Sequence, residues 1–355
     1  MTAIHQFLPT LAPRDAVGAH ALAVRDTLRG AGYESEIFAL EAKEHLRREA
    51  RDYRKFSPRN GTWLLYQMSI GSPVCDFVVN RPEPLIVNYH NVTPRRFFAQ
   101  WEPVVARNLA LGRDQLHALA ARAELGVAVS HFNERDLVET GFRRTAVAPV
   151  IVELDALRAD ADPALVERLR CGTSGGRWLF VGRIAPNKAQ HELVRAFAVY
   201  RDLFDSHAQL TLVGGLSSAA YELALRTTVS ELGLDDAVVF AGAATREELS
   251  AHYRAADVFV ICSEHEGFCV PLLEAMAHDL PIVACANGGV GETMGDAGVV
   301  LDTADPLTLA TAVDRVIGDE QLQSQLITAG RARLRDFNPD RARATFLDAI
   351  SAVVS

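Results

Sequence analysis

The sequence has few cysteines and lacks long apolar runs, and both features exclude several classes of protein. Its five cysteines, at positions 75, 171, 262, 269 and 285, are odd in number and form no C-x-x-C pair. This pattern argues against a disulfide framework or a zinc site and is typical of a reducing cytosol. No apolar run approaches the ~18 residues that suggest a membrane span. Residues 1–18 lack the basic start and apolar block of a signal peptide, so we expect a cytoplasmic protein.

Positive charge is not in excess either. The net charge is −9; residues 1–165 carry 20 basic and 20 acidic side chains, and the remainder carries 16 and 25. Nucleic-acid binding requires a basic face, so we expect no nucleic-acid partner. One local exception is residues 47–59, which hold six basic and two acidic side chains. We interpret this stretch as a solvated loop, with peripheral contact to a membrane surface or an anionic acceptor as the alternative.

Two domains are expected because 355 residues exceed the size at which a single core usually stops growing. From residue 177 onward, short apolar runs rich in β-branched residues alternate with segments of helical spacing. This alternation predicts a doubly wound parallel sheet, and the first half repeats it less regularly. We therefore predict an α/β protein with two Rossmann-like domains that face each other across a cleft. The expected domains are residues 1–165 and 166–337, with a C-terminal helix at 338–355 that packs back on the first.

Two cations follow the first strand of the second series. The strand ends in Gly182, Arg183 comes next, and Lys188 follows in the same strand-to-helix loop. A guanidinium offers a planar fork to phosphate oxygens, and an ammonium offers a compact point charge. Surface arginine and lysine are common, but as a pair directly after a buried strand they indicate a diphosphate site.

The stretch EGFCVPLLE, residues 266–274, follows another apolar strand and begins and ends with a carboxylate. Pro271 is suited to the first position of a helix. The amides of Gly267, Phe268, Cys269, Val270 and Leu272 would then gather at a helix N-terminus, which attracts anions. Glu266 and Glu274 would repel phosphates, so we expect them to accept hydrogen bonds from sugar hydroxyls, as an acidic residue does for ribose in Rossmann folds.

These motifs resemble those of the retaining GT-B glycosyltransferases of family four (glycosyl transferases group 1). The resemblance spans about residues 177–302, and the two glutamates separated by seven residues are among its most specific marks. It implies that Arg183 and Lys188 bind the diphosphate of a nucleotide-sugar donor, and that Glu274 binds the nucleotide ribose. Glu266 would hold hydroxyls of the transferred sugar. The second domain would then bind the donor, and the first would lie on the acceptor side.

The resemblance also implies contacts from the backbone. The amides of residues 267–270 would contact sugar and phosphate, and the base would contact the backbone near Gly242. Cys269 stands where the family usually has glycine, so we expect a modestly narrower pocket. In the first domain, only Gly18 remains of the family's glycine-rich turn. His90 ends an apolar strand like the family's cleft histidine beside the donor sugar. A lone histidine is more often structural, but this position after a strand and before turn residues keeps both interpretations open.

The implied reaction is the retaining transfer of a hexosyl unit from a UDP- or GDP-sugar to an acceptor hydroxyl, in glycan, glycolipid or glycosylated natural-product biosynthesis. The donor is a co-substrate, and no other cofactor is expected. No metal is expected, because two cations and a helix terminus would neutralise the leaving group. The acid pair at 160–162 follows no strand and carries little weight.

Two alternatives stay open: a GT-B sugar-nucleotide epimerase, and a catalytically silent protein that binds sugar nucleotides. A nicotinamide dehydrogenase is disfavoured because the sequence has no G-x-G-x-x-G; residues 288–295, GGVGETMG, miss that spacing. There is no G-x-x-x-x-G-K-[ST] phosphate loop either. The acceptor, the sugar, the nucleotide and the oligomeric state are not indicated by the sequence.

Overall fold

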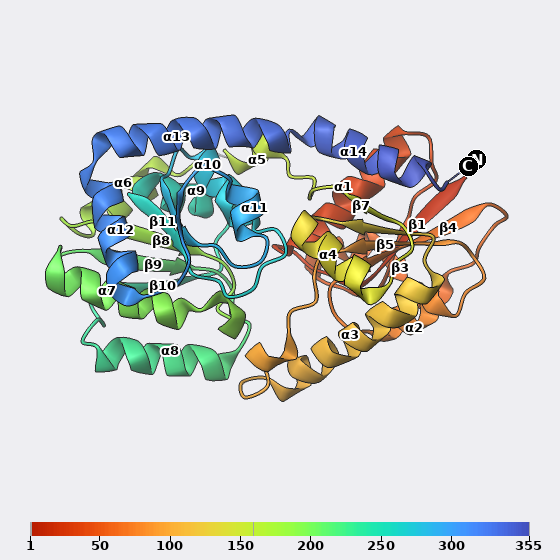
Figure 1. Cartoon of the computed structure of the whole chain (residues 1–355), viewed down its shortest axis with the longest axis horizontal. Coiled ribbons are helices and arrows are strands. Elements are labelled where there is room, and N and C mark those ends of the chain that lie inside the picture. The colour runs from red at the N-terminus through yellow and green to blue at the C-terminus, as the bar shows by residue number, and fades with distance from the viewer. Residues whose placement is uncertain (1, 159, 355) are drawn as a thin grey trace. The chain divides into compact units, whose positions relative to one another are not determined.

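A computed structural model describes residues 2–158 and 160–354, without the side chains of 155 and 156 (Figure 1). The chain divides into two compact units. The first comprises Met1–Ala99, Pro103–Val152 and Phe337–Ser355, and the second comprises Gln100–Glu102 and Glu153–Asp336. We describe each unit by itself.

The first unit is built on a parallel sheet. In the described part of the chain it has seven strands in the order β3-β2-β1-β4-β5-β6-β7. Every neighbouring pair is parallel. The strands are β1 (Ala3–Leu11), β2 (Ile37–Ala42), β3 (Ala50–Asp52), β4 (Thr62–Met68), β5 (Leu85–Tyr89), β6 (Leu125–Ala128) and β7 (Thr145–Val147). The order reverses between β1 and β4, and such a switch point is where open α/β sheets bind ligands.

Four of the described α-helices of the first unit connect its strands, and α14 follows the second unit in the chain. These helices are α1 (Ala16–Gly30), α2 (Pro73–Val79), α3 (Pro103–Arg122), α4 (His131–Thr140) and α14 (Pro339–Ser351). The C-terminal helix α14 belongs to this unit because its apolar stripe is buried in the unit's core. Phe346 and Ile350 are fully buried there beside Ile4 and Val24.

The second unit repeats the doubly wound plan. Among the described residues its sheet has six parallel strands in the order β10-β9-β8-β11-β12-β13. The strands are β8 (Arg177–Val181), β9 (Gln209–Val213), β10 (Val238–Gly242), β11 (Val258–Ile261), β12 (Ile282–Cys285) and β13 (Val299–Leu301). They are almost wholly apolar, as expected of parallel strands covered on both faces. Here the switch point falls between β8 and β11.

The helices of the second unit lie on both sides of its sheet, with α7 and α8 on one side and α9 and α10 on the other (Figure 1). They are α5 (Leu154–Leu157), α6 (Pro163–Cys171), α7 (Gln190–Leu203), α8 (Ala219–Glu231), α9 (Arg246–Ala255), α10 (Val270–Ala277), α11 (Val290–Met294), α12 (Pro306–Gly318) and α13 (Glu320–Leu334). Among the described helices, none combines the length and the apolar character needed to cross a membrane.

The change from one unit to the other falls between Val152 and Glu153, before the boundary expected after residue 165. The reason is helix α6, which packs against α9 of the second unit. Arg170 of α6 donates a hydrogen bond to the main-chain oxygen of Arg254, at 2.8 Å. The two predicted Rossmann-like folds are confirmed.

Candidate functional site

The loops after β8 and β11 lie side by side at the switch point of the second sheet, because these two strands are neighbours. Hydrogen bonds join the loops directly. The main-chain oxygen of Asn187 accepts from the amide of Glu264 at 2.9 Å, and the Asn187 side chain donates to the main-chain oxygen of His265 at 3.2 Å. Seven predicted site residues lie on these two loops: Gly182, Arg183, Lys188, Glu266, Gly267, Phe268 and Cys269.

Lys188 and Glu266 form an ion pair between the loops. Lys188 ends a 3₁₀ turn, Pro186–Lys188, and its Nζ contacts Oε1 of Glu266. The lysine side chain is 17% exposed and the glutamate side chain 10%. Burial of both groups strengthens their attraction, and each charge offsets the cost of burying the other. The structure therefore brings together the residue predicted for phosphate and the residue predicted for sugar.

Arg183 differs from Lys188 in its surroundings. It is exposed, and its main-chain oxygen accepts a hydrogen bond from Nε2 of Gln190 at 2.9 Å. Among the described residues, its guanidinium has no hydrogen bond or ion pair. All five of its N–H donors are thus available for an oxyanion.

Helix α10 begins at Val270, one residue before the predicted start at Pro271. The residue that precedes it, Cys269, has φ 75° and ψ 70°, the left-handed conformation that glycine adopts without penalty. The amide of Leu272 donates to the main-chain oxygen of Cys269 at 3.2 Å. Leu272 was predicted to offer its amide to an anion, and that prediction is wrong because the first turn of the helix already uses it. Burial raises the pKa of the Cys269 thiol, which disfavours the reactive thiolate.

Glu274 lies in the second turn of α10, half-buried, and is held by a tyrosine. Its Oε2 accepts a hydrogen bond from the hydroxyl of Tyr253 in α9, at 2.8 Å. Burial raises the pKa of Glu274, and the Tyr253 hydroxyl opposes that shift because it stabilises the carboxylate. The Tyr253 ring stacks on His278 with a centroid distance of 5.0 Å. Sequence reasoning missed Tyr253, whose spacing on an amphipathic helix gave no sign that it reaches the carboxylate.

Two glycines bring a third loop against Glu266 and Gly267. Gly288 and Gly289 follow β12, and the amide of Gly289 donates to the main-chain oxygen of Glu266 at 2.8 Å. A Cβ at Gly289 would lie 2.3 Å from the main-chain oxygen of Gly267, so only glycine permits this approach. The hydroxyl of Thr293 then donates to the main-chain oxygen of Phe268. The sequence GGVGETMG, which misses the spacing of a dinucleotide motif, supports the loop that carries Glu266.

Glycines also lie close together at the carboxyl ends of strands β8, β9 and β10. The amide of Gly214, which follows β9, donates to the main-chain oxygen of Gly242 at 2.8 Å. A Cβ at Gly214 would lie 1.9 Å from the oxygen of Gly182. The predicted site residues Gly182 and Gly242 thus lie on one closely packed edge of the second sheet, and Gly242, with φ 72°, is exposed.

In the first unit, Gly18 lies in the first turn of α1, where its amide donates to Oδ2 of Asp15 at 3.0 Å. His90 directly follows β5, and its Nε2 lies 2.7 Å from Oε1 of Gln67. Burial, assisted by the neighbouring His20, holds the pKa of His90 well below its usual value, so the imidazole is neutral near pH 7. Each of these two residues lies beside the carboxyl end of a strand, β1 or β5.

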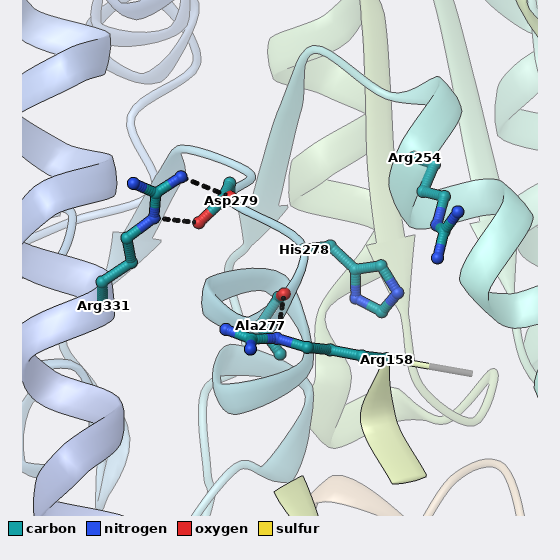
Figure 2. A pocket seen from close by; sticks show the side chains of 6 residues that line it. All are labelled: Arg158, Arg254, Ala277, His278, Asp279 and Arg331. Carbon is teal, nitrogen blue, oxygen red and sulfur yellow. Dashed lines mark hydrogen bonds and ion pairs between the residues drawn. The ribbon is translucent and has the colours of Figure 1, made fainter. Parts of the chain in front are cut away.

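A pocket of about 450 Å³ lies at the C-terminal end of α10 (Figure 2). Two of its arginines bind the end of α10 and the residues that follow it. Arg331 makes two hydrogen bonds of 2.7 Å to Asp279, and Nε of Arg158 donates to the main-chain oxygen of Ala277 at 3.1 Å. These contacts stabilise the C-terminal end of α10, and none of the predicted site residues lines the pocket.

The basic stretch at residues 47–59 is partly neutralised. Arg54 lies 3.6 Å from Asp52, and Arg59 lies 3.3 Å from Glu34. Membrane contact through this stretch stays a prediction. Across residues 2–158 and 160–354, no group of three or more histidine, cysteine or acidic side chains is placed to hold a metal ion.

The relatives by sequence are glycosyltransferases. The D-inositol 3-phosphate glycosyltransferase of Salinispora tropica is 34% identical over 205 residues, which cover 56% of this chain and 42% of that protein. A protein with the same name from Xylanimonas cellulosilytica is 30% identical over 250 residues, 67% of this chain and 58% of that protein. The chain spans about half the length of the curated relatives it matches.

Solved structures match almost the whole chain. Sucrose-phosphate synthase from Thermosynechococcus elongatus has a TM-score of 0.78 at 20% identity and covers 99% of both chains. HepE of Anabaena, solved with UDP-glucose, has a TM-score of 0.78 at 17% identity and covers 99% of this chain and all of that one. At these identities the likeness concerns the fold, which is the GT-B fold. Residues 174–333 match the family model of glycosyl transferases group 1. The region of residues 174–333 therefore belongs to the glycosyl transferases group 1 family.

Proposed function

We propose that the protein is a retaining hexosyltransferase that moves a sugar from a nucleoside diphosphate sugar to an acceptor hydroxyl. The observation that carries this proposal is the pairing of Lys188 with Glu266 across the loops after β8 and β11. Arg183 is exposed on the first of these loops, and α10 begins at the end of the second. The same edge of the sheet thus offers cations for a diphosphate and a carboxylate for sugar hydroxyls.

Donor binding would exchange the partners of the ion pair. The β-phosphate takes Lys188, and Glu266 then accepts hydrogen bonds from hydroxyls of the transferred sugar. Glu274, held by Tyr253, accepts from the ribose hydroxyls. When the bond from the anomeric carbon to the β-phosphate oxygen breaks, negative charge grows on that oxygen. Lys188, Arg183 and the N-terminus of α10 stabilise this charge, which lowers the barrier without a metal ion.

We expect the acceptor hydroxyl to attack from the face that the leaving phosphate occupies. Its proton passes to the phosphate oxygen, so the anomeric configuration is retained. Proton NMR of the first product tests this mechanism: the same configuration as in the donor supports it, and inversion contradicts it.

A UDP-sugar is the first donor to test, because HepE, which has the same fold, was solved with UDP-glucose. A GDP-sugar is the second. D-inositol 3-phosphate heads the acceptor panel because the relatives are named for it. Mass spectrometry of such reactions, with and without acceptor, separates the possibilities. A mass gain of one hexosyl unit on an acceptor supports transfer. Conversion of the donor sugar without any acceptor would instead indicate an epimerase, and donor binding without any product would indicate a silent binding protein.

A further inference from the structure

A row of buried amide side chains crosses the sheet of the first unit. Gln6 of β1, Gln67 of β4 and Asn88 of β5 lie on three neighbouring strands and are fully buried. Gln67 and Asn88 are direct partners in the strand register. Parallel strands covered by helices are usually apolar, and a buried amide costs free energy unless it is hydrogen-bonded. Three amides in one row therefore require a reason.

The hydrogen bonds in this row have a fixed direction. Nε2 of Gln6 donates to the main-chain oxygen of Ala21 at 2.9 Å, and a carbonyl oxygen can only accept. The oxygen of Gln6 must then accept from Gln67, whose Nε2 lies 2.7 Å away. This orientation turns the oxygen of Gln67 toward Nδ2 of Asn88 at 2.9 Å and toward Nε2 of His90 at 2.7 Å.

An amide oxygen that faces a ring nitrogen requires a proton on that nitrogen. In a neutral imidazole the other nitrogen then carries a lone pair and accepts hydrogen bonds. We propose that Gln6 and Gln67 are positioning residues that hold His90 as the Nε2–H tautomer, which leaves its Nδ1 as a hydrogen-bond acceptor. This assignment does not rest on the proposed function.

The surroundings of His90 keep the ring neutral and in place. The ring of His20 meets it edge to face, with a centroid distance of 5.2 Å. Nδ1 of His20 accepts from the amide of Ile151 at 3.0 Å, and burial lowers the pKa of His20 to about 4, so this second ring is neutral as well. After His90 the chain turns at Asn91, with φ 88°, whose side chain donates to Oδ1 of Asn133 at 2.7 Å.

Long-range ¹H–¹⁵N NMR of the full chain labelled with ¹⁵N-histidine tests the tautomer. His90→Gln identifies the signal of His90. The wild-type protein should show the pattern of Nε2–H. In Gln67→Met, which keeps the length of the side chain but removes the acceptor, the ratio of the two tautomers should shift roughly tenfold toward Nδ1–H, because one hydrogen bond is lost. An Nδ1–H pattern in the wild-type protein would by itself overturn the proposal.

Gln6→Met provides the sharper test, because Gln6 does not contact His90. Without the oxygen of Gln6, only Nδ2 of Asn88 still fixes the amide of Gln67, and a joint rotation of these two amides presents Nε2 of Gln67 to His90. The tautomer ratio should therefore move in the same direction as in Gln67→Met. The matched control is Gln115→Met, which removes another buried glutamine of this unit, one bonded to Ser72 and Asp76. It should leave the ratio unchanged, and a shift equal to that of Gln6→Met would refute a directed row.

Discussion

Replacement of Lys188 by methionine should destabilise the protein strongly before any substrate is added. Methionine keeps the apolar stem of the lysine but leaves the carboxylate of Glu266, 10% exposed, without its cation. Breaking a buried ion pair costs about 3–5 kcal/mol, and the residual exposure of this pair lowers the expected loss to about 2–3 kcal/mol. Urea unfolding at pH 7 measures the loss as a lower midpoint with an unchanged slope.

A double-mutant cycle isolates the ion pair itself. Glu266→Gln in the Lys188→Met background should recover part of the loss, with a coupling energy of about 1–3 kcal/mol. The control is Lys43→Met. Lys43 lies 3.6 Å from Glu41, and both side chains are about half exposed, so that variant should lose less than about 1 kcal/mol. If Lys188→Met loses no more than Lys43→Met and the cycle shows no coupling, the pairing described here does not exist in solution.

Three further predictions concern the second and first units. Tyr253→Phe removes the hydroxyl that holds Glu274, so calorimetry should show a Kd for UDP about tenfold higher than in the wild-type protein. Glu274→Gln should raise this Kd as well. An unchanged Kd in Tyr253→Phe would mean that Tyr253 does not orient the ribose site. Cys269→Gly should change the free energy of unfolding by less than about 1 kcal/mol, because relief of left-handed strain offsets the loss of a buried thiol. Cys269→Val should lose more than about 2 kcal/mol, because β-branched residues tolerate that conformation worst; equal losses on urea unfolding would contradict this. The pKa of His20 is about 4 in the folded protein, below its value of 6.5 in the unfolded chain. Between these two pH values the unfolded chain binds a proton that the folded protein does not. The free energy of unfolding should therefore fall by about 3 kcal/mol as the pH drops from 6.5 toward 4. His20→Gln should flatten this part of the stability profile, and an unaltered profile would show that His20 is not buried as a neutral ring.

The fold and the two loops of the candidate site followed from local pattern. Apolar strands alternating with helical segments predict doubly wound sheets, and this topology makes β8 and β11 neighbours. Arg183, Lys188 and Glu266 follow those strands, so their assembly at one edge could be anticipated from the sequence.

Side-chain partners could not be predicted, because they depend on distances across the sheet. The sequence placed Lys188 with phosphate and Glu266 with sugar but did not show that the two residues bind each other. The sequence also did not reveal the left-handed conformation of Cys269, because a glycine can indicate such a backbone position and a cysteine does not. Gln6 and Gln67 are polar residues within apolar strands, yet only the hydrogen bond between their side chains shows that they form a row.

Calorimetric titration of UDP and of GDP into the intact protein tests most directly whether the loops after β8 and β11 hold a nucleoside diphosphate. We predict saturable heat from one of the two nucleotides, and a Kd at least tenfold higher in Lys188→Met under conditions where that variant is still folded. Absence of heat from both nucleotides, or an equal Kd in the two proteins, would contradict the assignment of Lys188 to the diphosphate.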